Sequence, residues 1–138
     1  MSARTLRQNQ EAAVIDVGSN SVRLVVYRID GRAMTPILNE KVMAGLGRDL
    51  SRNGTLAKGS VEIALAALTR FAALIEALDV RDVFPVATAA VREASDGPAF
   101  VKRVADETGI KLRVLSGEDE ARLSALGVAG GSPDAAGV

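Results

Sequence analysis

The spacing of apolar residues first changes from a strand pattern to a helix pattern at Ser60, and that change limits the folds open to this chain. Before Ser60, apolar runs rich in β-branched residues predict strands at 12–17, 22–29 and about 34–42. From Val61 onward, apolar residues recur every three or four positions, which predicts an amphipathic helix. A dinucleotide-binding unit needs a helix directly after its first strand and glycine turn, so a conventional nicotinamide site is not expected.

Two more strands and two more helices are expected after the first helix. The strands are expected at 82–87 and 110–115. Between them, a helix is expected to begin near Pro98, with Asp96 or Ser95 as its N-cap, and to end at Gly109. The last helix is expected to begin at a Ser116–Asp119 capping box and to run to about 128. The order β-β-β-α-β-α-β-α matches one lobe of the actin-like fold of sugar kinases and heat-shock chaperones. We therefore predict an α/β chain whose mixed sheet is flanked by helices.

The connections of the first three strands are also readable. Asp30-Gly31 favours a tight hairpin turn, and Pro36 predicts an edge position or a bulge for the third strand. Residues 44–59 contain several glycines and are expected to form a loop.

Composition removes whole classes of chemistry. The 138 residues are 48% hydrophobic and 25% charged, enough for one folded domain, and they include no cysteine, histidine or tryptophan. Disulfide frameworks, Cys/His zinc sites, thiol nucleophiles and imidazole acid–base catalysis are therefore excluded. Seventeen basic residues balance seventeen acidic ones, so neither a nucleic-acid partner nor a membrane-surface partner is expected.

The chain ends and its apolar runs bear on compartment. Residues 1–11 are polar rather than a signal peptide, and we expect them to form a flexible arm. No apolar run reaches the roughly 18–20 residues of a membrane span, so a cytoplasmic protein is expected.

The first candidate site is the run Asp16-Val17-Gly18-Ser19-Asn20-Ser21, which follows an apolar strand. An aspartate there can hold a hard cation. Gly18 allows close approach of an anion, and Ser19, Asn20 and Ser21 supply donors to phosphate oxygens. A simple hairpin turn is the alternative, but an ionisable residue at the end of a buried strand costs stability unless it has a use.

Two further candidates also follow strands. Arg92, within residues 87–94, could clamp phosphate through its planar fork, or it could form a surface pair with Glu93. The acidic residues at 118–120 could cap a helix, or one of them could orient or deprotonate a water. All three segments follow the carboxyl end of a predicted strand, where α/β sheets bind ligands.

Three stretches, AVIDVGSNSVRLVVYRI, ATAAVREASD and VLSGEDEARL, resemble in order and spacing the motifs of the exopolyphosphatase/guanosine pentaphosphate phosphohydrolase (Ppx/GppA) family. The loop GLGRDLSRNGTL is similar to that family's glycine-rich segment after the third strand. The resemblance spans nearly the whole chain. It implies an actin-like fold and Mg²⁺-assisted hydrolysis of a terminal phosphoanhydride in polyphosphate or guanosine pentaphosphate.

The resemblance also implies a role for each matching residue. Asp16 would assist the metal, and Glu120 falls at the position of the water-activating glutamate. The remaining matches would bind phosphate: Gly18, Ser19, Asn20, Ser21 and Arg92. A polyanionic substrate needs charge neutralisation by a metal and an arginine and an in-line water held by a carboxylate, so these roles are chemically coherent.

The chain departs from the family pattern at three places. Asp96 stands where asparagine is usual, and Asp119 where a second glutamate is common. The family continues with a further strand and a D-x-G-G-G-S turn, which is not found here. We therefore expect a fragment, in which residues 12–128 are a truncated first subdomain and residues 129–138 are a loop that leads to a missing strand. The fragment alone is expected to be inactive, and the full-length protein could form a homodimer.

Two other functions stay open from the sequence. A small-molecule kinase of the same fold would transfer phosphate to an acceptor, although such kinases usually show a shorter Gly/Thr-type turn than the Ser-Asn-Ser run here. A non-catalytic nucleotide-sensing module would bind guanosine pentaphosphate without releasing phosphate. Phosphate release without an acceptor separates the hydrolase from both.

Overall fold

Within residues 9–129, which the computed structural model describes, five strands form one mixed sheet in the order β3-β2-β1-β4-β5. The strands are β1 (Asn9–Val17), β2 (Ser21–Asp30), β3 (Ala33–Met43), β4 (Asp82–Ala87) and β5 (Arg113–Val114). β1, β2 and β3 pair antiparallel, whereas β4 and β5 run parallel to β1. The carboxyl ends of β1, β4 and β5 therefore meet at one edge of the sheet.

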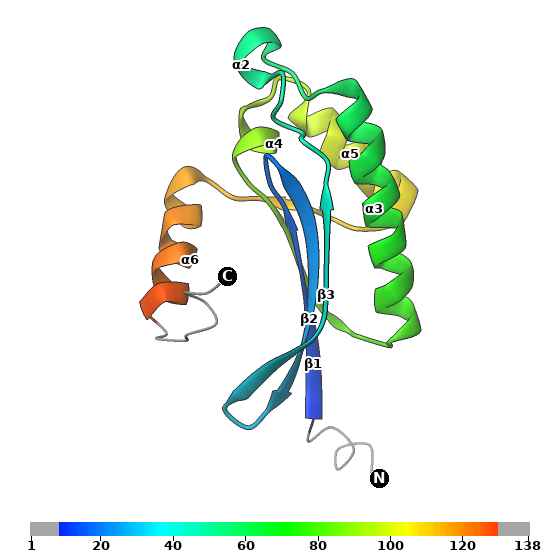
Figure 1. Ribbon diagram of the computed structural model, residues 1–138, viewed down its shortest axis with the longest axis vertical. Coiled ribbons are helices and arrows are strands. Elements are labelled where there is room, and N and C mark those ends of the chain that lie inside the picture. Colours follow the sequence, from blue (N-terminus) through cyan, green and yellow to red (C-terminus); the bar gives the residue numbers. More distant parts are fainter. Residues whose placement is uncertain (1–8, 130–138) are drawn as a thin grey trace.

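Helices cover this sheet unevenly. They are α2 (Leu50–Asn53), α3 (Lys58–Ala77), α4 (Ala89–Glu93), α5 (Gly97–Thr108) and α6 (Gly117–Ala129). Figure 1 shows α3 and α5 on one side of the sheet, α6 on the other, and α2 and α4 near the end where β1 stops. None of the helices in this described part of the chain is long and apolar enough to cross a membrane.

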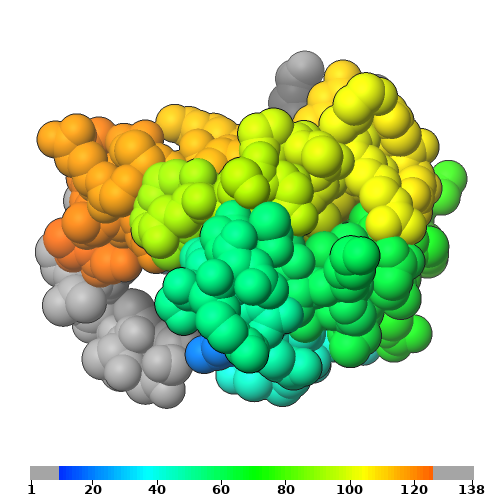
Figure 2. Space-filling model, turned by 90° about the horizontal axis from the view of Figure 1, so that it is seen from above, coloured from blue at the N-terminus to red at the C-terminus, as the bar shows by residue number. Residues whose placement is uncertain are grey.

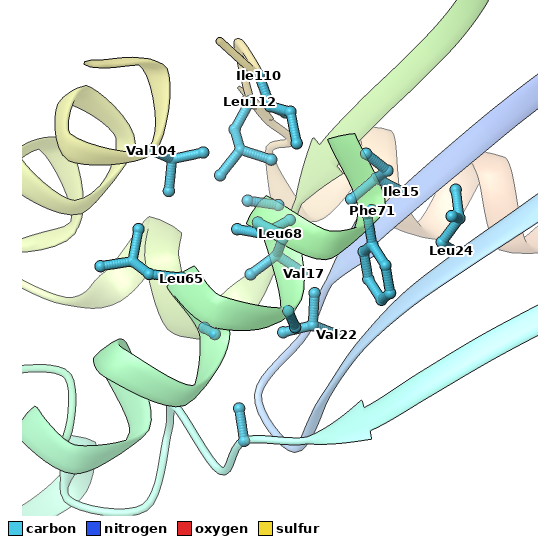
Figure 3. Close-up of a cluster of buried hydrophobic side chains, with 14 of the residues drawn as sticks. Ile15, Val17, Val22, Leu24, Leu65, Leu68, Phe71, Val104, Ile110 and Leu112 are labelled. Atoms are coloured by element: carbon cyan, nitrogen blue, oxygen red, sulfur yellow. The ribbon is translucent and has the colours of Figure 1, made fainter. Parts of the chain in front are cut away.

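The core lies between the sheet and the pair α3 and α5. Alternation along β1 and β2 turns every second residue toward these helices, and those side chains are fully buried: Ala13, Ile15, Val17, Val22, Leu24 and Val26. Leu65, Leu68 and Phe71 of α3 pack onto them from above, with Val104, Ile110 and Leu112 closing the cluster (Figure 3). The opposite face of the sheet is more open, and Phe84 is 55% exposed there.

The predicted order of major elements is confirmed, and with it the α/β class. β4 has the predicted bounds, and α5 ends at Thr108 with Gly109 as its C-cap, in the left-handed conformation with φ 79° that favours glycine. Pro36 sits on the edge strand β3, opposite Tyr27, where the register with β2 shifts by a bulge. Both readings of that proline were correct.

Four boundaries are corrected by the structure. The loop predicted at 44–59 contains the short helix α2, and α3 already begins at Lys58. The strand predicted at 110–115 pairs with β4 only at Arg113–Val114. Ile110 and Leu112 are apolar because their side chains pack into the core, and they form no strand pairs. Residues 9–11 of the expected arm belong to β1; the rest of the arm, and 130–138, lie outside the described residues.

The predicted caps are half right. Ser116 Oγ accepts a hydrogen bond from the Asp119 amide at 2.9 Å, as a capping box requires. Asp96 occupies the N-cap position of α5, but its side chain makes no cap bond there. Its Oδ1 accepts from the Leu56 amide at 3.0 Å instead, and so ties the start of α5 to the loop before α3.

Candidate phosphate-binding site

The turn between β1 and β2 is held from behind by the loop that follows β3. The Gly18 amide donates to Ser21 O at 2.9 Å, which closes the turn. Asn20 O accepts from the amides of Ala44 and Gly45 at 3.0 and 2.9 Å, and Ser19 O accepts from Gly47 at 3.0 Å. The turn is thus a hairpin connection, as its alternative reading held, and also a fixed element whose carbonyls are already bonded.

Three separate segments meet at this turn. A Cβ added to Gly47 would lie 3.2 Å from Ser19 Cβ and 3.6 Å from Ala90 Cβ. The loop therefore packs closely against both the turn and α4 at Gly47, which has no side chain. The Thr88 amide donates to Val17 O at 3.1 Å and fixes the start of α4 to the end of β1. Seen from above in Figure 2, α4 lies between α2 and α6, at the end of the molecule where these segments gather.

Asp16 stands one residue before the end of β1. Its neighbours Ile15 and Val17 are buried toward the helices, so Asp16 projects from the opposite, open face of the sheet and is exposed. Desolvation by the surrounding chain raises the pKa of its carboxyl, Arg23 on the paired strand β2 lowers this pKa, and the charge of Glu120 raises it. Asp16 and Glu120 therefore lie close enough to interact.

Arg92 and Glu120 form the clearest polar contact of the site. Arg92 Nη1 donates to Glu120 Oε1 at 3.1 Å and to Leu115 O at 3.0 Å. The proposed surface pair with Glu93 exists too, at 3.5 Å, but Arg92 is only 26% exposed and its shorter bonds point to the sheet edge. α4 and α6 are thereby joined across the end of β5.

The carboxylates suit a hard cation in a limited way. No group of three or more acidic, histidine or cysteine side chains that could hold a metal occurs among residues 9–129. Asp16 and Glu120 nevertheless supply two carboxylates whose charges interact, and Mg²⁺ is usually bound by one or two carboxylates plus substrate phosphates and waters. The residues present fit a cation that arrives with a phosphate substrate.

The structure brings together all the residues that the sequence proposed, and adds others. Gly18, Ser19, Asn20 and Ser21 form the turn and the first residue of β2, beside α4 with Arg92. Sequence reasoning missed Arg23 and Gly47. Alternation along β2 would have placed Arg23 on the face of Asp16, whereas the contact of Gly47 with Ser19 carries no local signal.

Comparison with known proteins places the chain in a family. The sequence profile of the Ppx/GppA phosphatase family matches residues 25–138. Exopolyphosphatase 1 of Mycobacterium tuberculosis is 34% identical over 116 residues, covering 83% of this chain and 34% of that protein. A bifunctional 3-dehydroquinate synthase/phosphatase of Fusobacterium nucleatum is 30% identical over 129 residues, or 88% of this chain and 19% of that protein. The chain thus spans between about a fifth and about a third of the length of these relatives.

Solved structures share the fold. The Ppx/GppA family member of Aquifex aeolicus superposes with a TM-score of 0.83 at 33% identity, over 88% of this chain and 40% of that one. An exopolyphosphatase from Cytophaga hutchinsonii gives a TM-score of 0.81 at 30% identity, over 86% and 38%. The predicted actin-like fold is confirmed, and the chain belongs to the Ppx/GppA phosphatase family.

Proposed function

We propose that this chain carries the phosphate-binding turn and the water-activating glutamate of a phosphoanhydride hydrolase. The reaction would release orthophosphate from the end of inorganic polyphosphate, of guanosine pentaphosphate, or of both. The observation that carries the proposal is the 3.1 Å contact between Arg92 and Glu120 at the sheet edge that also holds the Gly18–Asn20 turn. Family membership supports it.

Each residue has a role that its position allows. Ser19, Asn20 and Ser21 would donate amide and side-chain hydrogens to the terminal phosphate, and Gly18, which has no side chain, would let that phosphate approach the backbone closely. Arg92 would neutralise that phosphate through its remaining guanidinium N–H groups. Glu120 would accept the proton of a water that attacks the phosphorus, as the bridging oxygen leaves with the shortened chain.

Asp16, with Glu120 nearby, is the residue that we assign to a magnesium ion. When bound, Mg²⁺ would neutralise charge on the phosphate oxygens. Asp16 itself contributes an exposed carboxylate at the end of a rigid strand, so its position is set by the ladders to β2 and β4 and needs no loop rearrangement.

We further propose that residues 12–128 are the first subdomain of a two-lobed site. The matched region covers 34% of the Mycobacterium tuberculosis protein and 19% of the Fusobacterium nucleatum protein, so both relatives are several times as long. A second phosphate-binding loop from the rest of the family's length would face the turn described here. The 138-residue chain is then expected to bind phosphate but to turn over little.

The test is phosphate release from polyphosphate with Mg²⁺, in a family-length protein that contains this chain. Glu120→Gln should lower the rate by about 100-fold or more, because it removes the base and keeps an oxygen for Arg92. Glu118→Gln, in the same first turn of α6 and exposed, is the matched control and should leave the rate unchanged. A Glu120→Gln protein of normal activity contradicts the assignment, and phosphate binding without any release contradicts the hydrolase.

A further inference from the structure

A cavity separate from the Arg92–Glu120 contact lies between α2 and the first turn of α3. Its volume is about 470 Å³. Arg48, Lys58, Asn53, Thr55, Ser60 and Asp49 supply its polar wall. We call this cavity the α2–α3 pocket.

The charges in the wall of the α2–α3 pocket favour an anion. Neither Arg48 nor Lys58 forms an ion pair with any carboxylate of residues 9–129, and both are exposed. The carboxylate in the wall, Asp49, is paired with Arg52 at 3.2 Å. The first turn of α3 contains no acidic residue. Two uncompensated cations therefore face the same space.

The pocket is joined to the phosphate-binding turn through Gly45. A Cβ added to Gly45 would lie 3.0 Å from Arg48 Nη2, so the guanidinium lies directly over this glycine. The Gly45 amide donates to Asn20 O at 2.9 Å, and Gly45 O accepts from Ser60 Oγ at 3.0 Å. Ser60 is buried, at 2% exposure. One backbone residue thus separates the Arg48 guanidinium from the turn, and a buried hydroxyl holds it in place.

We infer that the α2–α3 pocket is a second phosphate-group site, which takes phosphates further along a substrate whose terminal phosphate lies at the Gly18–Asn20 turn. The inference rests on the proposed function of that turn. Arg48 would bridge the two sites, and Lys58 would bind beyond it. The bound chemistry is a run of linked phosphates, from either a linear polyphosphate or the phosphate chain of a guanosine nucleotide.

The test is binding, measured by calorimetry on the 138-residue chain with orthophosphate, sodium tripolyphosphate and GTP. Tripolyphosphate should bind about tenfold more tightly than orthophosphate, because it reaches the second site. The double variant Arg48→Ala/Lys58→Ala should lose that advantage and keep its orthophosphate affinity. A loss for GTP as well as tripolyphosphate assigns the pocket to nucleotide phosphates too; a loss for tripolyphosphate alone assigns it to the linear polymer.

The control is Arg32→Ala/Arg81→Ala, which removes the same charge from the turn between β2 and β3 and from the residue before β4. Both lie at the end of the sheet away from α2 and α4 (Figure 1). It should leave the tripolyphosphate advantage intact, and an equal loss in both double variants would mean that only net charge matters, which overturns the inference. Wild-type chain that binds tripolyphosphate no better than orthophosphate also overturns it. Arg92→Ala separates the two proposals. It should lower orthophosphate affinity, because it alters the site at the turn, whereas Arg48→Ala/Lys58→Ala should leave orthophosphate affinity unchanged.

Discussion

Arg92 Nη1 donates to two acceptors that belong to different elements, Glu120 Oε1 at 3.1 Å and Leu115 O at 3.0 Å. These two hydrogen bonds tie α4 to the residue that follows β5 and to the first turn of α6. The guanidinium therefore sets the position of the glutamate as well as offering its own charge. A lysine at this position could keep the charge but not the geometry, because its ammonium has no planar fork.

Arg92→Lys should weaken orthophosphate binding by about tenfold while the chain remains folded. The physical reason is that one ammonium cannot hold Glu120, Leu115 O and a phosphate together. Calorimetry gives the affinity, and circular dichroism checks the fold. Arg122→Lys, an exposed arginine of α6 paired with Asp119, is the control and should bind as wild type. Equal affinities for Arg92→Lys and wild type would remove Arg92 from the site.

Asp16 should make stability depend on pH in the direction opposite to a salt-bridged carboxylate. Its pKa is raised in the folded chain, so the stability that it contributes is present below the ordinary value of 3.8 and is lost as pH rises through the raised pKa. Asp16→Asn should therefore raise the free energy of unfolding at pH 7 by about 0.5 kcal/mol, a small figure because the exposed side chain is screened by solvent.

Urea unfolding at pH 7 and below pH 3.8 checks this, since the difference between Asp16→Asn and wild type should vanish at the lower pH. Asp106→Asn is the comparison. It breaks an exposed pair with Lys102 and should not stabilise the chain at either pH. A destabilised Asp16→Asn at pH 7 would mean that the carboxylate stabilises the fold rather than serving a ligand.

Gly97 is the position where backbone approach is closest. A Cβ there would overlap the backbone carbonyl oxygen of Val91, so α4 and α5 would have to separate. Gly97→Ala should lower the free energy of unfolding by about 1–3 kcal/mol and weaken phosphate binding, because α4 carries Arg92. Gly59→Ala, in open space at the start of α3, should instead raise stability by about 0.5–1 kcal/mol.

Two phenylalanines test where the core is. Phe71 is fully buried on the side of α3 that packs against the sheet, and Phe84 is 55% exposed on the open face of the sheet. Phe71→Ala should cost about 3–5 kcal/mol of stability by urea unfolding, because it leaves a cavity. Phe84→Ala should cost less than about 1 kcal/mol. Similar losses at both positions would mean that the open face is covered in solution.

The sequence was sufficient for the major elements because they follow local rules. Apolar runs rich in β-branched residues located β1, β2 and β3, and the predicted period of α3 included its buried residues Leu65, Leu68 and Ile75. That period did not include Phe71, which is buried, and it did include Leu78, which is 42% exposed. The three candidate segments met as expected, because parallel strands bring their carboxyl ends to one edge. Motif resemblance then ranked residues such as Arg92 and Glu120 that single-site reasoning left open between a structural and a chemical role.

What the sequence did not reveal depends on partners distant in the chain. Asp96 has the residue type and place of an N-cap, yet its carboxylate bonds to Leu56, 40 residues earlier. The orientation of Arg48 over Gly45 and the contact of Gly47 with Ser19 come from tertiary packing of the loop after β3. The glycines of that loop predicted only a loop at 44–59, whereas in the fold its amides hold the carbonyls of Ser19 and Asn20.

The two hydrogen bonds accepted by Asn20 O have a consequence for selectivity. A bare carbonyl at the tip of a turn attracts cations and repels oxyanions. Here the amides of Ala44 and Gly45 occupy this oxygen at 3.0 and 2.9 Å, and the Gly47 amide occupies Ser19 O. These bonds reduce the negative potential that the two carbonyl oxygens present at the turn, so the turn repels an anion less. The loop after β3 therefore favours anions over cations at the turn through its backbone amides alone, without a charged side chain.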